Sequence, residues 1–117
     1  MENSKLIEQV INELLQKTID NKVPWDVINP NAIRWVKKSQ NITTVVLQKA
    51  VMQTPGNSTL TENYVLSIQT QPAGINIQIN TAVEQSMREI FSKLFIEAMK
   101  VANDKTAQIL RDLLEGL

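Results

Sequence analysis

The chain has 117 residues and no formal net charge, because twelve basic side chains balance twelve acidic ones. Overall charge therefore gives no reason to expect nucleic acid or an acidic membrane as a partner. The absence of cysteine and histidine excludes disulfides, zinc sites of the Cys/His kind, thiolate nucleophiles and imidazole bases. We expect one domain over residues 1–117, with no cofactor and no metal.

The first segment predicts an amphipathic helix over about residues 4–20. Side chains suited to a buried stripe recur there at helical spacing: Ile7, Val10, Ile11, Leu14, Leu15 and Thr18. The helix is expected to end before Pro24, since the residue that precedes a proline avoids the helical conformation. Trp25 follows, and we expect its large ring to fill one end of the core.

Residues 31–80 alternate between apolar and polar side chains, and short turns divide them. This pattern predicts an antiparallel meander of three strands and a short fourth, with a longer polar loop over residues 54–63. In the first strand Ile33 and Trp35 share one face, so Trp35 is expected in the core. Arg34 then points to the opposite face.

The last third of the chain predicts two helices, over about residues 82–102 and 104–116. Thr81 and Glu84 fit a capping box that would start the first of them. Asp104 is a good N-cap, so we expect a kink or a break before it. The final helix carries apolar side chains along one face: Ala107, Leu110, Leu113, Leu114 and Leu117.

Together these elements predict an α+β fold with the order α-β-β-β-(β)-α-α. An antiparallel meander of three to four strands would carry the N-terminal and C-terminal helices on one face. The beginning of the sequence lacks the apolar segment of a signal peptide, and no apolar run is long enough to span a bilayer. A cytoplasmic protein without membrane contact is therefore expected.

The sequence offers little for catalysis. Acidic side chains are spread along the predicted helices and alternate with basic ones, so they favour solvated helix faces rather than a pair of catalytic carboxylates. The single glycine of the 54–63 loop does not make a phosphate-binding loop. We therefore predict that the protein is not an enzyme.

Two surfaces are candidates for binding a partner. Residues 31–61 contain four basic side chains and no acidic one, so this part of the chain is locally positive. The outer face of the predicted sheet would mix basic and apolar side chains, at Arg34, Val36, Lys38 and Val46. The final helix has spare apolar surface that includes Leu113 and Leu117, which would pack on the first helix or on a second copy of the chain.

These observations favour a small, non-enzymatic module for protein–protein contact that forms a homodimer. The alternative is a module that binds a small ligand or a nucleotide, using the basic strands and a pocket between sheet and helices. Binding of nucleic acid ranks third, because Trp35 is expected on the face opposite Arg34 and Lys38, whereas stacking needs aromatic and basic side chains on one surface.

The order of several segments resembles a group of short bacterial proteins built as helix, meander and helix. The resemblance lies in "NAIRW" at the start of the meander, "YVLSI" in an inner strand and "LFIEAMKVA" before a leucine-rich end. Those proteins carry a glycine before the final helix, where this chain has "ANDK". The resemblance implies an adaptor or effector-associated module of a mobile element or a bacterial conflict system. It implies no active-site residue.

Overall fold

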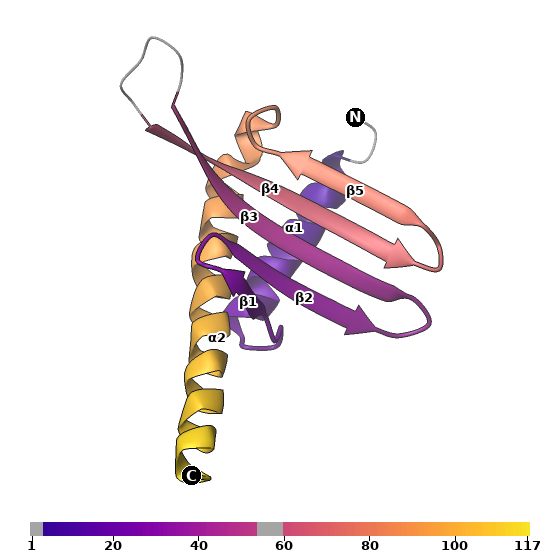
Figure 1. Ribbon diagram of the computed structural model, residues 1–117. Helices are drawn as coiled ribbons and strands as arrows, with labels where there is room; N and C mark the ends of the chain where they lie inside the picture. The colour runs from indigo at the N-terminus through magenta and orange to yellow at the C-terminus, as the bar shows by residue number, and fades with distance from the viewer. Residues whose placement is uncertain (1–3, 54–59) are drawn as a thin grey trace.

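The computed structural model describes residues 4–53 and 60–117, and the side chains of residues 5–51 and 62–117 (Figure 1). Its elements follow one another along the chain as α1 (Ser4–Ile19), β1 (Asp26–Asn29), β2 (Ala32–Lys38), β3 (Ile42–Gln53), β4 (Leu60–Gln71), β5 (Ile75–Asn80), the short 3₁₀ helix η1 (Gln85–Met87) and α2 (Arg88–Glu115).

The strands in the described residues form one five-stranded sheet in the order β1-β2-β3-β4-β5, and every neighbouring pair is antiparallel. One row of side chains crosses the sheet, because Ile33 lies opposite Leu47, Leu47 opposite Leu66, and Leu66 opposite Ile79. All four are buried. The alternation of apolar and polar residues therefore predicts the core face correctly, and the α+β class with an antiparallel sheet is confirmed.

The sheet begins earlier than the predicted residue 31. The additional strand, β1, has only four residues and lies between Pro24 and Pro30. Proline usually marks turns and edges, so this stretch reads as a loop in the sequence. At the other end of the strands, β3 continues to residue 53, up to the predicted loop, and β4 already begins at residue 60, within that loop. Its residues 54–59 lie outside the described part of the chain.

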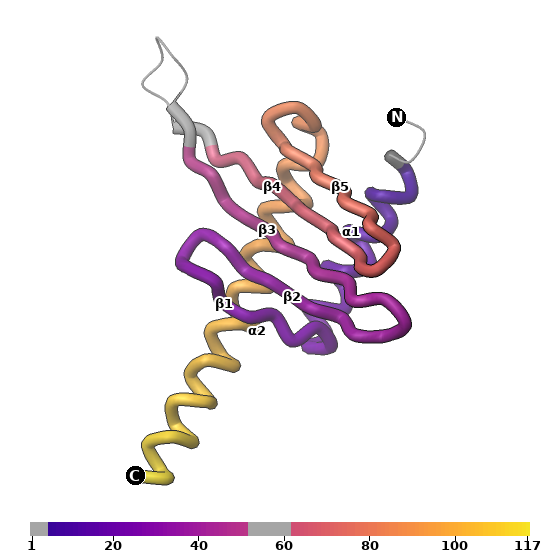
Figure 2. Tube along the Cα trace, turned by 45° about the vertical axis from the view of Figure 1, so that its right-hand side comes forward, coloured from indigo at the N-terminus to yellow at the C-terminus, as the bar shows by residue number. Residues whose placement is uncertain are grey.

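Both helices lie on the same face of the sheet, as predicted (Figures 1 and 2). Trp25 fills one end of the core between them and is fully buried. Its indole Nε1 donates a hydrogen bond to the Thr18 hydroxyl at 3.0 Å, and that hydroxyl donates to the Leu14 carbonyl at 2.7 Å. Trp35 lies on the same face but is only partly buried, with its ring 6.4 Å from that of Trp25.

The predicted helix start at residue 82 is wrong. The Thr81 hydroxyl does not cap a helix: it accepts a hydrogen bond from the Tyr64 amide at 2.9 Å and donates to the Asn63 side chain at 3.3 Å. A turn and η1 follow Thr81, and the regular helix begins only at Arg88. The threonine thus ties the end of the sheet together instead of starting α2.

The predicted break before Asp104 is also wrong, because α2 is a single helix of 28 residues. Residue 103 and Asp104 are exposed, so nothing packed against them requires the helix to bend. The last buried residue of α2 is Ala102, and Lys105 forms a 2.6 Å ion pair with Asp26 at the edge of the sheet.

Beyond this ion pair α2 extends away from the sheet (Figure 2). We call residues 106–117 the projecting end. The radius of gyration is 15.9 Å, whereas a compact chain of this length would have a value of about 13 Å. The projecting end helps to account for this difference, and its large aliphatic side chains are 58–93% exposed.

Candidate functional site

The candidate residues of the sheet do lie together. Arg34 is opposite Val46 across β2 and β3, and both belong to the outer face, which carries no helix. Val36 and Lys38 lie on the same face of β2, where Arg34 and Lys38 are exposed and Val36 and Val46 are partly covered. The outer face thus has the mixed character that the sequence predicts.

Leu113 and Leu117 lie elsewhere. Both belong to the projecting end, with Leu113 on α2 and Leu117 just past its last residue. This helix starts on the opposite face of the sheet and leads away from it (Figure 1). Of the two alternatives for these leucines, packing on α1 and packing on a second copy, the first does not occur, because 61% of Leu113 and 93% of Leu117 remain exposed. The six candidate residues therefore form two separate surfaces.

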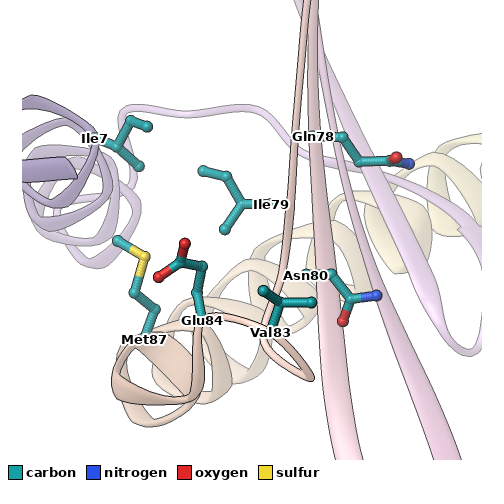
Figure 3. A pocket seen from close by; sticks show the side chains of 7 residues that line it. All are labelled: Ile7, Gln78, Ile79, Asn80, Val83, Glu84 and Met87. Atoms are coloured by element: carbon teal, nitrogen blue, oxygen red, sulfur yellow. The ribbon is translucent and has the colours of Figure 1, made fainter. Parts of the chain in front are cut away.

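Two cavities lie between α1 and the sheet. One has a volume of about 270 Å³ and is lined by aliphatic side chains: Leu6, Ile7, Val10, Ile11, Leu66, Ile68 and Ile77. The other, of about 220 Å³, shares Ile7 with it. Figure 3 shows Ile7, Ile79 and Met87 converging on this second cavity, whereas Gln78 points to the other side of β5.

These cavities are separated from the basic strand residues. Arg34 is on the outer face, whereas the cavities open on the face that carries the helices. A small ligand in a cavity could not contact Arg34 or Lys38, and the aliphatic lining of the larger cavity offers no donor for a phosphate. The structure therefore separates the basic strand residues from these cavities, and the use of both in one nucleotide site stays a prediction.

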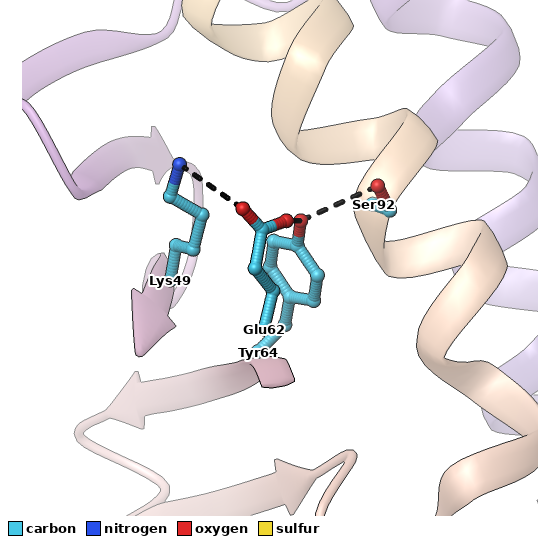
Figure 4. A network of polar contacts seen from close by, with 4 residues as sticks. All are labelled: Lys49, Glu62, Tyr64 and Ser92. Atoms are coloured by element: carbon cyan, nitrogen blue, oxygen red, sulfur yellow. Dashed lines mark hydrogen bonds and ion pairs between the residues drawn. The ribbon is translucent and has the colours of Figure 1, made fainter. Parts of the chain in front are cut away.

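A chain of polar contacts links the sheet to α2 near Tyr64 (Figure 4). The Tyr64 hydroxyl lies 3.3 Å from the Glu62 carboxylate and 3.3 Å from the Ser92 hydroxyl. The Lys49 ammonium is 4.0 Å from the other Glu62 oxygen. Burial raises the pKa of Tyr64, and the nearby Glu62 carboxylate raises it further, against an opposing effect of Ser92.

This arrangement keeps the Tyr64 phenol protonated at neutral pH, so Tyr64 cannot act there as a base toward Ser92. The contacts join β3, β4 and α2, and the Tyr64 ring also packs against Phe95 at 5.7 Å between centroids. The cluster is best explained as a structural link rather than as a catalytic group.

The continuous helix brings out a pattern that the predicted break conceals. Besides its buried side chains, α2 carries a second row that continues just past the end of the helix to Leu117. Its members are spaced in alternating steps of three and four residues: Ile96, Met99, Asn103, Thr106, Leu110, Leu113 and Leu117. We call this row the seam. Its spacing is that of the a and d positions of a coiled coil. The signal was present in the sequence, but splitting the helix at Asp104 divided the row in two.

Most of the seam is open to solvent, whereas Met99 packs partly against the core. The seam's large aliphatic side chains Ile96, Leu110, Leu113 and Leu117, and the flanking Ile109 and Leu114, are 55–93% exposed. Such a contiguous apolar surface on a small protein is typical of a contact with another molecule.

A shallow groove runs beside the first half of the seam. We call it the seam groove, and it has a volume of about 400 Å³. Its lining comes from β3, β4 and α2: Lys49, Glu62, Tyr64, Ser92, Phe95, Ile96, Met99, Lys100 and Asn103. The Lys49 ammonium lies 5.6 Å from the centre of the Phe95 ring, so its aliphatic stem forms part of the wall.

Within residues 4–53 and 60–117, no group of three or more acidic residues could hold a metal ion. In the same ranges no helix is long and apolar enough to cross a membrane. Comparison with known protein families finds no match, and comparisons with curated proteins and with solved structures find none either. The resemblance to bacterial helix–meander–helix proteins stays a prediction.

Proposed function

We propose that this chain is a non-enzymatic module for protein–protein contact and that it associates with a second copy of itself through the seam of α2. The observation that carries the proposal is the uncovered row of aliphatic side chains on a helix that extends past the sheet. A helix end of this kind gains most of its stability from burying its apolar face.

The amount of uncovered surface supports a dimer. The six exposed aliphatic side chains of α2 amount to about four fully exposed ones per copy. At about 60–120 Å² each, two copies would remove about 500–950 Å² of apolar surface from water. The smaller specific interfaces bury about 1,200 Å², of which about 65% is apolar in homodimers. The seam is therefore sufficient for a dimer of moderate affinity.

The polar residues of the seam favour a dimer in which the two α2 helices bind with limited affinity and in one defined register. Asn103 and Thr106 lie next to each other in the row, with Met99 before them and Leu110 after them. A polar side chain at a core position of a coiled coil lowers stability but selects one alignment, because it avoids apolar partners. This property suits a reversible contact between copies.

The outer face of the sheet stays uncovered when two copies associate through the seam. Arg34, Val36, Lys38 and Val46 would serve a different protein partner, since they lie away from the seam. An adaptor needs two such surfaces. The resemblance to adaptor-type bacterial modules agrees with this role and names no partner.

Binding of a small apolar ligand is the second candidate function. It is favoured by the aliphatic cavity beside α1, which adjoins the cavity in Figure 3. Thermal-shift measurements with medium-chain fatty acids and with nucleotides separate the possibilities. Stabilisation by the fatty acid, lost in Ile77→Gln, supports an apolar ligand; stabilisation by a nucleotide, lost in Arg34→Ala, supports a nucleotide site.

The main proposal is tested by the dependence of the melting temperature on protein concentration. Association stabilises the folded chain by mass action, so the melting temperature should rise for each roughly tenfold increase in concentration. Leu113→Lys places a charge in the seam and should abolish this rise without lowering the melting temperature of the dilute protein. A melting temperature that is independent of concentration in the unchanged protein contradicts self-association.

A further inference from the structure

We propose that the two copies pair in antiparallel orientation, so that the projecting end of each lies in the seam groove of the other. This inference rests on the proposed self-association and adds to it the binding site, its occupant and the direction of the helices. The occupant is residues 106–117 of a second copy, and the site is the groove beside residues 92–103.

The first argument is the match of length. The groove-lining part of α2 spans twelve residues, which corresponds to about 18 Å of helix, and the helical part of the projecting end, residues 106–115, spans about 15 Å. Seam side chains occupy both parts, with Thr106, Leu110, Leu113 and Leu117 on the projecting end. Antiparallel pairing would align them with Asn103, Met99, Ile96 and Ser92 of the other copy, all of which line the groove.

The second argument is the chemistry of the pairs so formed. Leu110 would meet Met99 and Leu113 would meet Ile96, so aliphatic groups pack on aliphatic groups. Asn103 would meet Thr106, so each buried polar side chain has a hydrogen-bonding partner. The two-fold axis repeats every pair, as an isologous interface requires.

The third argument is the width of the apolar face. Ile109 and Leu114 flank the seam on both sides of the projecting end, and both are more than half exposed. Two projecting ends side by side would bury the seam and leave these flanks partly in water. The groove instead offers a wall made by Phe95 and the Lys49 stem, which can cover a flank.

The fourth argument is electrostatic. In antiparallel pairing the carbonyl ends of the two α2 helices lie at opposite ends of the interface. Helix ends of like partial charge repel one another. Parallel pairing would instead bring both carbonyl ends together, with Glu115 beside its own copy.

Cysteine cross-linking tests the orientation, because the natural chain has no cysteine that could react. Met99→Cys and Leu110→Cys replace exposed or partly exposed seam residues, so the fold is preserved, and circular dichroism checks this. The two variants are mixed, allowed to exchange and oxidised. Each variant oxidised alone is the matched control, and sedimentation of the unchanged protein reports whether it associates at all.

The antiparallel arrangement places Cys-bearing positions 99 and 110 opposite each other. It separates position 110 of one copy from position 110 of the other by about 16 Å along the helix, far beyond the reach of a disulfide. We therefore expect a covalent dimer in the mixture and none in either variant alone. A covalent dimer from Leu110→Cys alone indicates parallel pairing and overturns the inference.

Two further outcomes are distinguishable. If the unchanged protein associates but neither the mixture nor the single variants cross-link, the interface lies elsewhere: the orientation is wrong and self-association stands. If the unchanged protein is monomeric, the proposed self-association itself fails, and the docking arrangement fails with it.

Discussion

Replacing Leu113 by alanine tests the energetic role of the seam with a single small change. Leu113 is 61% exposed in the isolated chain. Full burial of a leucine side chain contributes about 1.5–3 kcal/mol. Alanine keeps one of the four side-chain carbons, so the substitution should remove about 0.7–1.4 kcal/mol of interface energy from each copy.

Both copies carry the substitution, so the dimer loses about 1.4–2.8 kcal/mol, which corresponds to a dissociation constant about 10- to 100-fold larger. Dilution calorimetry measures this constant directly. Urea unfolding of the dilute protein should change little, because most of the Leu113 side chain is in water before association.

Leu6→Ala is the matched control. Leu6 is also a helical leucine and is 59% exposed, but it lies on α1, beside the aliphatic cavity and away from the seam. Its truncation should leave the dissociation constant unchanged. Equal effects of the two substitutions, or no effect of Leu113→Ala, refute the assignment of the interface to the seam.

Three further predictions concern the core, the polar cluster and the seam. Thr18→Val removes the acceptor of the buried Trp25 indole and should lower the free energy of unfolding by about 1–3 kcal/mol, measured by urea unfolding. Tyr64 is the only tyrosine, so the change of tyrosine ultraviolet absorbance with pH reports the ionisation of this one phenol. The pH midpoint of that change should lie above 10 in the folded chain and return toward 10 in guanidinium. Because the raised pKa favours the neutral folded form, its stabilising contribution is complete below pH 10 and falls as pH rises further; Tyr64→Phe should lack this fall. Asn103→Leu should tighten the dimer in sedimentation and weaken its preference for one cross-linking pattern.

The core of the sheet is predictable from the sequence because its pattern is local. Alternation along each strand places Ile33, Leu47, Leu66 and Ile79 on one face, and short turns bring them into register. The same alternation separates Arg34 from Trp35. These features depend only on the geometry of an extended chain, so the structure agrees with them.

The wrong predictions arise where local structure depends on residues that are distant in the sequence. Thr81 has the sequence context of a helix cap, but its hydroxyl binds the amide of Tyr64, 17 residues earlier. Asp104 is a good N-cap residue, yet nothing packs against it that would end the helix. Strand β1 is held by its pairing with β2, which compensates for a short stretch bounded by prolines.

The seam can be recognised only once α2 is known to continue past Asp104. Leu113 and Leu117 are identifiable in the sequence as surplus apolar residues, but their connection to Ile96 and Met99 requires one continuous helix. The groove wall at Lys49 and the projection of α2 past the sheet depend on tertiary packing, which helical spacing alone does not specify.

Sedimentation equilibrium of the unchanged chain tests the central claim most directly. Between about 10 and 500 µM, a range that covers dimers of moderate affinity, the average mass should rise from the chain mass of 13.2 kDa toward twice that value. A mass that stays at 13.2 kDa throughout this range contradicts self-association through the seam.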